Sequence, residues 1–205
     1  MPEGTPYIIG LTGGVAAGKS LVAGILQRWG AEVIDADQLA RSAVAPGSRG
    51  LEQVIAAFGT GILLQDGTLD RKKTASIVFS DPGRRALLES ILHPEIRALA
   101  AAEIGRLAKK GVQILFYMAP LLIEAGTVAA VDEVWVVTVR PEVQIERLML
   151  RDGIDREAAL RIIGSQMPLD QKERYGSVVI DNSGTPEQTE CGLKLIWEQR
   201  IRERL

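Results

Sequence analysis

The chain has 205 residues, of which 46% are hydrophobic, and its formal net charge at pH 7 is -2. This composition predicts a soluble globular protein with a buried core, and the nearly balanced charge gives no overall attraction to nucleic acid or to an anionic membrane. A single cysteine, Cys191, excludes an intramolecular disulfide framework, and no apolar run has the length of a membrane span. Because the N-terminal residues do not resemble a secretion signal, we expect a cytoplasmic protein with no nucleic-acid or membrane partner.

The first motif along the chain is a glycine-rich segment, residues 13–20, with the sequence Gly-Gly-Val-Ala-Ala-Gly-Lys-Ser. It fits the G-x-x-x-x-G-K-[ST] pattern of a P-loop, and we call it the phosphate loop. An apolar run at 7–11 predicts a buried parallel strand before it, and helical spacing over 21–29 predicts a helix after it. A chance match has a probability on the order of one per cent in a chain of this length. We therefore predict a site for nucleotide phosphates.

In such a site, backbone N–H groups of the loop and the positive end of the following helix face the phosphates. We expect Lys19 to reach the outer phosphates and the Ser20 hydroxyl to bind Mg²⁺. The residues predicted to bind the nucleotide in this segment are Gly13, Gly14, Val15, Ala16, Ala17, Gly18, Lys19, Ser20 and Leu21.

Beyond the phosphate loop, short apolar segments alternate with helical patterns. The segments that predict strands are 7–11, 31–34, 112–117, 133–139 and 177–180. Because helices separate them, we predict an α/β fold with a five-stranded, mainly parallel sheet and helices on both faces.

Three of the helices have clear start signals in the sequence. Asp81-Pro82 combines an N-cap with a proline at the first helical position, and predicts a helix that ends near Leu92. A second helix is expected from Pro94 to Lys110. A capping box that begins at Thr185 predicts a last helix that extends to about Leu205.

Two long regions interrupt the alternation of strands and helices. Residues 35–111 are mostly helical, and residues 140–175 are helical and rich in arginine. In open parallel sheets, ligands bind at the carboxyl ends of the strands, where such insertions are attached. We therefore expect a single domain with a helical acceptor-binding insertion and an arginine-rich lid. The expected parts are a core of about 1–37, 111–139 and 176–205, the insertion of about 38–110, and the lid of about 140–175.

Two carboxylates, Asp35 and Asp37, end the second predicted strand. Strand alternation places both on the same face of the sheet. A carboxylate at this edge can accept a proton from an attacking hydroxyl and hold Mg²⁺ through water. The alternative is an N-cap for a helix at 38–44. Spacing alone does not decide, and one of the two residues can do each task.

The arginine-rich region contains Arg147 and Arg151, which are four residues apart and share a helix face. Arginines neutralise the charge that develops on the migrating phosphoryl group during phosphoryl transfer. The alternative is a solvated helix face on which Glu142, Glu146 and Asp152 are exposed partners. We expect one or two of the cations in this region to be functional.

His93, Glu124 and Asn182 are further candidates for the site, and the sequence leaves two interpretations open for each of the first two. His93 is the only histidine, so it cannot build a metal site, and it either caps the helix at Pro94 or contacts an acceptor phosphate. Glu124 follows the third predicted strand and either orients a substrate or caps a turn. Asn182 is the only asparagine and Ser183 follows it, so the Asn-Lys-x-Asp motif of GTPases is absent.

Ten motifs follow one another along nearly the whole chain, at 10–14, 18–20, 34–41, 67–71, 92–94, 120–124, 144–151, Gln166, Lys172 and 179–184. Together they resemble the dephospho-CoA kinase family of P-loop kinases. The chain departs from this family at Val15-Ala16-Ala17, where Ile-Gly-Ser is more usual, and at Leu21, where threonine is usual. A Tyr-Gly-Ser sequence at 175–177 also replaces the family's Ala-Asp pair.

This resemblance implies transfer of a phosphoryl group from ATP, with Mg²⁺, to the ribose 3′-hydroxyl of dephospho-coenzyme A, the last step of coenzyme A synthesis. It implies that Asp37 is the general base and that Lys19 and Arg147 act on the phosphates. Thr12, Arg41, His93 and Glu124 resemble acceptor-binding positions, and Asn182 resembles part of the adenine pocket.

Two alternatives remain open for the function. One is a P-loop kinase for another small alcohol or nucleotide, since the same architecture serves many acceptors. The other is a nucleotide-dependent regulatory protein. We expect a monomer or a small homo-oligomer.

Overall fold

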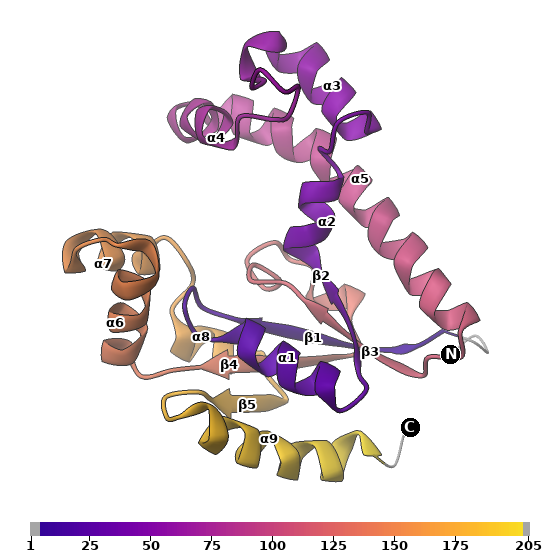
Figure 1. Cartoon of the computed structure of the whole chain (residues 1–205), viewed down its shortest axis with the longest axis vertical. Helices are drawn as coiled ribbons and strands as arrows, with labels where there is room; N and C mark the ends of the chain where they lie inside the picture. Colours follow the sequence, from indigo (N-terminus) through magenta and orange to yellow (C-terminus); the bar gives the residue numbers. More distant parts are fainter. Residues whose placement is uncertain (1–4, 203–205) are drawn as a thin grey trace. The chain divides into compact units, whose positions relative to one another are not determined.

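The computed structural model describes residues 5–202 and is drawn in Figure 1. The chain forms two compact units. The first unit consists of Met1–Ile34 and Leu107–Leu205, and the second consists of Asp35–Arg106. Among the described residues, no helix is both long and apolar enough to cross a membrane.

The first unit is built on a sheet with the strand order β2-β3-β1-β4-β5. The strands are β1 (Tyr7–Gly13), β2 (Glu32–Asp35), β3 (Ile114–Met118), β4 (Glu133–Thr138) and β5 (Val178–Asp181). The pairings of β1 with β3, β1 with β4 and β4 with β5 are all parallel. The predicted five-stranded α/β sheet is therefore confirmed, and each strand begins and ends within two residues of its predicted limits.

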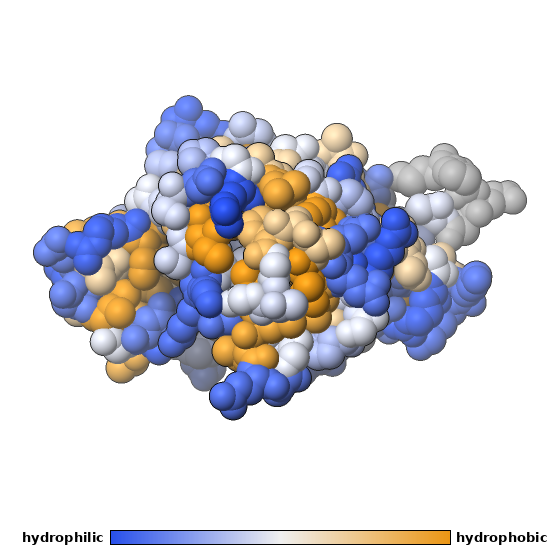
Figure 2. Space-filling view, turned by 90° about the horizontal axis from the view of Figure 1, so that it is seen from above, coloured by the Kyte–Doolittle hydropathy of each residue, from blue (hydrophilic) through white to orange (hydrophobic). Residues whose placement is uncertain are grey.

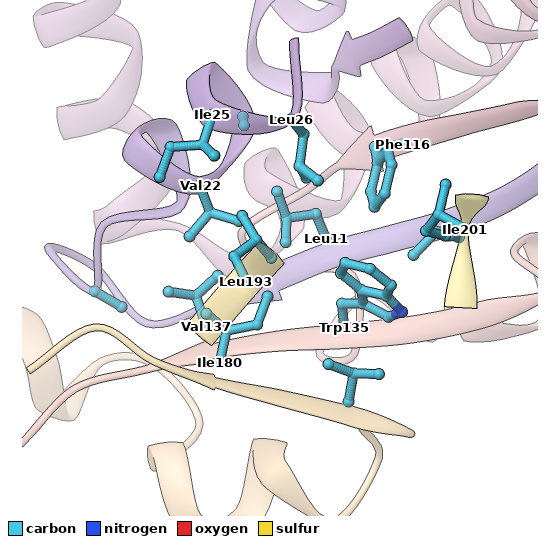
Figure 3. Packing of buried hydrophobic residues seen from close by; sticks show 14 of the residues in the cluster. Leu11, Val22, Ile25, Leu26, Phe116, Trp135, Val137, Ile180, Leu193 and Ile201 are labelled. Carbon is cyan, nitrogen blue, oxygen red and sulfur yellow. The ribbon is translucent and has the colours of Figure 1, made fainter. Parts of the chain in front are cut away.

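The core of this unit lies between the sheet and the helices α1 (Lys19–Arg28) and α9 (Pro186–Arg200). Figure 3 shows Val22 and Leu26 of α1 on the side of the helix that faces the strands, and Ile25 of the same helix is also fully buried. Phe116 of β3 and Trp135 of β4 meet edge to face, with ring centroids 5.2 Å apart. This packing fixes the axis of α1, and therefore the place of its first turn at the carboxyl end of β1.

The strands alternate as expected for a sheet that is covered on both faces. Leu11, Trp135 and Val137 point into the core under α1 and α9, whereas Val134 and Val136 are buried on the opposite face. The capping box at Thr185 opens α9 as predicted. The predicted extension of this helix to Leu205 reaches beyond the described residues, and the helix itself ends at Arg200.

The arginine-rich segment, residues 140–175, forms three short helices in the first unit. These are α6 (Pro141–Asp152), α7 (Arg156–Gly164) and α8 (Leu169–Glu173). Gly153 ends α6 in a left-handed conformation, with φ of 65°, and the Asp155 side chain caps α7 by accepting from Ala158 N–H. Helices α6 and α7 pack on each other through Ile145, Leu148 and Ala159. The loop before β4 contains a short 3₁₀ helix, η2 (Val128–Ala130).

The second unit contains the helices α2 (Ala36–Ser42), α3 (Arg49–Phe58), η1 (Thr60–Ile62) and α4 (Arg71–Ser80), together with most of α5 (Pro82–Lys109). The prediction of two helices separated near His93 is wrong, because α5 is continuous and Pro94 lies inside it. A proline inside a helix removes one N–H and frees the carbonyl four residues earlier, here that of Ser90. Both residues are exposed, so water can solvate the freed carbonyl and the helix continues.

Candidate active site

The phosphate loop joins β1 to α1 in a conformation that requires its glycines. Gly13 has φ of 150° and Gly18 has φ of 94°. A Cβ atom at Gly13 would overlap the Val137 carbonyl, and one at Gly18 would overlap the Asn182 amide. Gly18 is the N-cap of α1 and offers no side-chain hydrogen bond to the helix. The first turn of α1 is therefore open to an anion, which its N–H groups and dipole favour.

Lys19 and Ser20 occupy the first turn of α1. Lys19 Nζ lies over the loop and donates to the carbonyls of Gly13, at 2.9 Å, and Gly14, at 2.8 Å. The Ser20 side chain is exposed. An ammonium group and a hydroxyl thus stand at the mouth of the loop, where a polyphosphate and its metal ion would need them.

Asn182, which directly follows β5, is 1% exposed, and its buried side chain is hydrogen-bonded to the phosphate loop. Its Nδ2 donates to the Ala17 carbonyl at 2.8 Å, and its Oδ1 accepts from the Thr189 hydroxyl at 2.8 Å. The Asn182 side chain therefore acts on the site by holding the backbone of the phosphate loop. The spacing of residues in the sequence could not show this contact.

Arg147 of α6 is the cation of the arginine-rich segment that lies beside the phosphate loop. Its guanidinium donates to the carbonyls of Asn182, at 2.9 Å, and Gly184, at 3.3 Å. A Cβ atom on Gly18 would be 3.8 Å from Arg147 Nη1. The structure thus brings Arg147, Asn182 and the phosphate loop together.

Other cations of this segment behave as the solvated-face alternative describes. Arg151 pairs with Asp152 at 2.7 Å and Arg156 pairs with Glu142 at 3.0 Å, both on the surface. The bond with Asp152 raises the pKa of Arg151, and the same bond lowers the pKa of Asp152. Exposed pairs of this kind contribute little to stability or to binding.

Lys172 differs from these surface cations because its side chain is fully buried. Its Nζ lies 2.8 Å from Glu124 Oε1 and donates to the Pro120 carbonyl at 2.9 Å. Thr12, also fully buried, donates its hydroxyl to the same carbonyl at 3.3 Å. Glu124 is therefore held by an ion pair, and it also accepts from Met167 N–H at 3.2 Å.

Asp181, the last residue of β5, has a carboxylate whose charged form is favoured. Ser183 donates its hydroxyl and its N–H to Asp181, and these bonds, with the positive charge of Arg140, lower the pKa of Asp181. Burial opposes this shift. The Ser183 hydroxyl also accepts from Arg140 N–H at 2.8 Å, so the turn that supplies two carbonyls to Arg147 is itself hydrogen-bonded.

Two glutamines that received no role from the sequence contact the phosphate loop. Gln144 Nε2 of α6 donates to the Val15 carbonyl at 2.8 Å, and Gln166 Oε1 accepts from Val15 N–H at 2.8 Å. They lie 129 and 151 residues from Val15 along the chain, so no local pattern could have revealed the contacts. The only available signal was that both occur in motifs of the resemblance.

In the second unit, the carboxylates of Asp35, the last residue of β2, and of Asp37 have different environments. Asp35 is the N-cap of α2 and accepts from the N–H groups of Asp37, at 2.8 Å, and Gln38, at 3.4 Å. Asp37 lies in the first helical turn with an exposed side chain. The expectation that strand alternation places both on one face is wrong, because the strand ends at Asp35 and α2 begins at Ala36.

The remaining predicted acceptor-side residues of this unit are Arg41, in the last turn of α2, and His93, inside α5. Both side chains are exposed. The interpretation of His93 as a helix cap is wrong, because α5 begins eleven positions earlier, at Pro82. Its imidazole remains available on the surface of α5.

The donor set for a metal ion is small. Within residues 5–202, no group of three or more histidine, cysteine, aspartate or glutamate side chains could hold one. Mg²⁺ commonly takes only one or two protein ligands and completes its shell with phosphate oxygens and water. The exposed hydroxyl of Ser20 beside Lys19 fits that mode of binding.

Comparison with known proteins agrees with this geometry. The family model described as dephospho-CoA kinase matches residues 7–188. A dephospho-CoA kinase of Geobacter sulfurreducens is 54% identical over 194 residues, which cover 95% of this chain and 98% of that protein.

Solved structures with the same fold cover nearly the whole chain. A crystal structure of a Thermus thermophilus protein matches with a TM-score of 0.81 and 35% identity, and covers 96% of this chain and 98% of that one. A dephospho-CoA kinase from Campylobacter jejuni matches with a TM-score of 0.64 and 26% identity, over 95% and 97% of the two chains. The predicted P-loop kinase fold is thereby confirmed.

Proposed function

This chain belongs to the dephospho-CoA kinase family, and from that premise we propose that it phosphorylates the ribose 3′-hydroxyl of dephospho-coenzyme A with ATP. The products are coenzyme A and ADP, and the reaction is the last step of coenzyme A synthesis. The observation that carries the proposal is the phosphate loop on the first turn of α1, with Lys19 and Arg147 beside it.

The phosphate groups of ATP would be bound by the amides of the loop and of the first turn of α1. Lys19 would exchange its bonds with the Gly13 and Gly14 carbonyls for phosphate oxygens, and Arg147 would approach from α6. The Ser20 hydroxyl would hold Mg²⁺, which would supply positive charge to the phosphate oxygens. These cations stabilise the charge that develops on the transferred group and on the leaving ADP.

The acceptor hydroxyl attacks the γ-phosphorus while the bond to the bridging oxygen of ADP breaks. Asp37 is proposed as the general base that takes the proton of that hydroxyl. Its carboxylate is exposed in the first turn of α2, whereas Asp35 Oδ1 accepts from two N–H groups and serves as the N-cap, which supports Asp37 as the base. Thr12, Arg41, His93 and Glu124 are proposed to bind or orient the acceptor.

Several expectations from the sequence stay predictions at this point. They include the cytoplasmic location, the absence of nucleic-acid and membrane partners, and a monomeric or small oligomeric state. The division into a core, an acceptor-binding insertion and a lid also stays a prediction.

The experiment that tests the proposal is ADP release from Mg-ATP with one acceptor at a time. Dephospho-CoA, adenosine, AMP and shikimate are compared, and mass spectrometry identifies the product. We expect stimulation by dephospho-CoA with coenzyme A as the product, and loss of turnover in Lys19→Ala. Stimulation by another acceptor alone would keep the kinase chemistry and replace the substrate. No stimulation by any of them would favour a regulatory protein.

A further inference from the structure

The peptide of Val15, in the middle of the phosphate loop, is bound on both sides by glutamine side chains. Gln144 donates to its carbonyl and Gln166 accepts from its N–H, each at 2.8 Å. The backbone groups dictate these roles, because a carbonyl can only accept and an N–H can only donate. Gln144 therefore presents its NH₂ group, and Gln166 presents its carbonyl oxygen.

The contact of Gln144 with the loop is close and buried. Gln144 is 5% exposed, and a Cβ atom on Gly14 would lie 2.8 Å from its Nε2. Any side chain at position 14 would therefore displace Gln144. The glycine at this place serves the glutamine contact as well as the curvature of the loop.

The residue after Val15 shows why this peptide needs to be held. Ala16 has φ of 55°, the left-handed region, and is the one residue other than glycine with positive φ in the described part of the chain. A Cβ atom makes this conformation unfavourable, and the surroundings must enforce it. A glycine would adopt this conformation without that cost, so an alanine here depends more strongly on the contacts of its neighbours.

We propose that Gln144 and Gln166 are positioning residues that hold the Val15 peptide, and through it keep Ala16 and the loop amides in the conformation that receives phosphate. Neither needs to touch the nucleotide. Gln144 lies on α6, and Gln166 lies between α7 and α8, so the two bonds join opposite ends of the arginine-rich segment to the loop.

The segment near Gln166 is anchored separately. Met167 N–H donates to Glu124, and Lys172 of α8 pairs with the same carboxylate. Gln166 therefore approaches Val15 from backbone that is fixed to the loop after β3. This anchoring makes the glutamine a rigid support, and its removal leaves the Val15 N–H without that acceptor.

Replacing either glutamine by glutamate adds the same charge but has opposite effects on the hydrogen bond to Val15, because Gln144 donates and Gln166 accepts. Gln166→Glu keeps an acceptor for Val15 N–H, whereas Gln144→Glu places a carboxylate oxygen against the Val15 carbonyl. Gln171→Glu on the exposed side of α8 is the control for added charge. ADP affinity is measured by calorimetry on the whole chain without acceptor, so the readout holds whichever acceptor the enzyme uses, although the inference rests on the proposed nucleotide site.

We expect Gln144→Glu to bind ADP at least about tenfold more weakly than Gln166→Glu, which corresponds to the loss of one buried hydrogen bond. Gln166→Ala should also weaken binding, and Gln166→Glu should restore part of that loss. Burial and the facing Val15 carbonyl should raise the pKa of a glutamate at position 144, and its protonated form can donate, so the ratio between the two glutamate variants should shrink as pH falls from 8 to 5. A purely structural role would not give that pH dependence.

Equal affinities for the two glutamate variants, or a Gln166→Ala affinity equal to that of Gln171→Glu, would overturn the proposal. If Gln144→Glu does not fold, as judged by circular dichroism, the comparison of Gln166→Ala with Gln166→Glu decides by itself. Failure of the wild-type chain to bind ADP would refute the nucleotide site, and is thereby distinguished from failure of the positioning role.

Discussion

The two units of this chain support their candidate residues in different ways. In the first unit, several polar side chains are almost fully buried, namely Thr12, Gln144, Lys172, Asn182 and Thr189, and two of them, Gln144 and Asn182, bond to the phosphate loop. In the second unit, Asp37, Arg41 and His93 lie exposed on helices. The buried apolar residues of the second unit form a small group from α3, η1 and the turn that follows α2.

This difference in burial suits the two kinds of ligand that the units are proposed to bind, the phosphate groups and the acceptor. A phosphate group has a fixed shape and charge, and a rigid array of donors binds it with little reorganisation. Exposed side chains on helices with few buried neighbours can adjust to a larger and more flexible acceptor. Large apolar side chains such as Phe79 of α4, 84% exposed, show how little of this unit is buried. Figure 2 shows hydrophobic side chains reaching the surface between hydrophilic ones on the face that it draws.

The largest effect that this comparison predicts is at Asp37. Asp37→Asn should lower kcat by about 10²- to 10⁴-fold, the usual contribution of a general base. ADP affinity should stay the same, because the phosphate loop belongs to the other unit. Steady-state kinetics and calorimetry check the two halves of this expectation.

The matched variant for that experiment is Asp35→Asn. Asparagine is as good an N-cap as aspartate, so α2 and turnover should both be retained. Equal losses of kcat in both variants would show that the carboxylate pair supports the helix and does not act in proton transfer.

The second largest effect concerns the buried ion pair of Lys172 and Glu124. Glu124→Ala should lower the free energy of unfolding by about 3 kcal/mol, because it leaves a charged ammonium buried without its partner. Lys172→Met should cost only about 1 kcal/mol, since a methionine fills the space and water can reach the freed carboxylate. The Glu124 side chain is 23% exposed and that of Lys172 is 0% exposed, which is the basis of the asymmetry. Denaturant unfolding measures both values, and equal losses would contradict this account.

A third experiment tests whether the second unit is the less stable one. Leu51 of α3 is 4% exposed, and Leu51→Ala should destabilise its own unit by about 2 kcal/mol, the low end of the range for buried leucines. Hydrogen exchange should quicken in 35–106, while the strands of the sheet keep their protection. Leu195→Ala on α9, where the leucine is 59% exposed, is the control. Uniform loss of protection over the whole chain would show that the two units unfold together.

What the sequence could predict follows from the range of the interactions involved. The phosphate loop, the strands and the capping box at Thr185 depend on residues close together in the chain, and all were found. The continuation of α5 through Pro94 was missed, because the exposure of Ser90 that makes it tolerable is a property of the folded chain. The start of α2 at Ala36 was missed because Asp35 and Asp37 were equally good caps from their spacing alone.

The supports of the loop could not be predicted because they come from distant parts of the chain. Asn182 bonds to Ala17 across 165 residues, and Gln166 bonds to Val15 across 151. Glutamine and asparagine give no periodic signal, and their value lies in matching one donor or acceptor that only the folded backbone presents. The resemblance marked these positions without giving a physical reason for them.

The smallest predicted effects are on stability and on the KM for ATP, and they come from a comparison of two similar turns, one in each unit. Asp181 accepts from the hydroxyl and N–H of Ser183, and Asp66 accepts in the same way from Thr68. Both carboxylates have a lowered pKa, chiefly because of the hydroxyl bond. A lowered pKa stabilises the folded state above the normal aspartate pKa, and this stability is lost as pH falls through the folded value.

Asp181→Asn should therefore be less stable than the wild type at pH 7 by less than about 1 kcal/mol, since the group is exposed to solvent, and the difference should vanish once the pH falls below the lowered pKa of Asp181. Asp66→Asn should show the same direction of pH dependence. The two positions should differ in catalysis, because only the turn of Asp181 supplies carbonyls to Arg147. Asp181→Ala, which removes the acceptor of both bonds, should thus raise the KM for ATP a few-fold while Asp66→Ala leaves it unchanged. If both leave KM unchanged, Arg147 is placed by α6 alone, and the loop after β5 serves only to complete the fold.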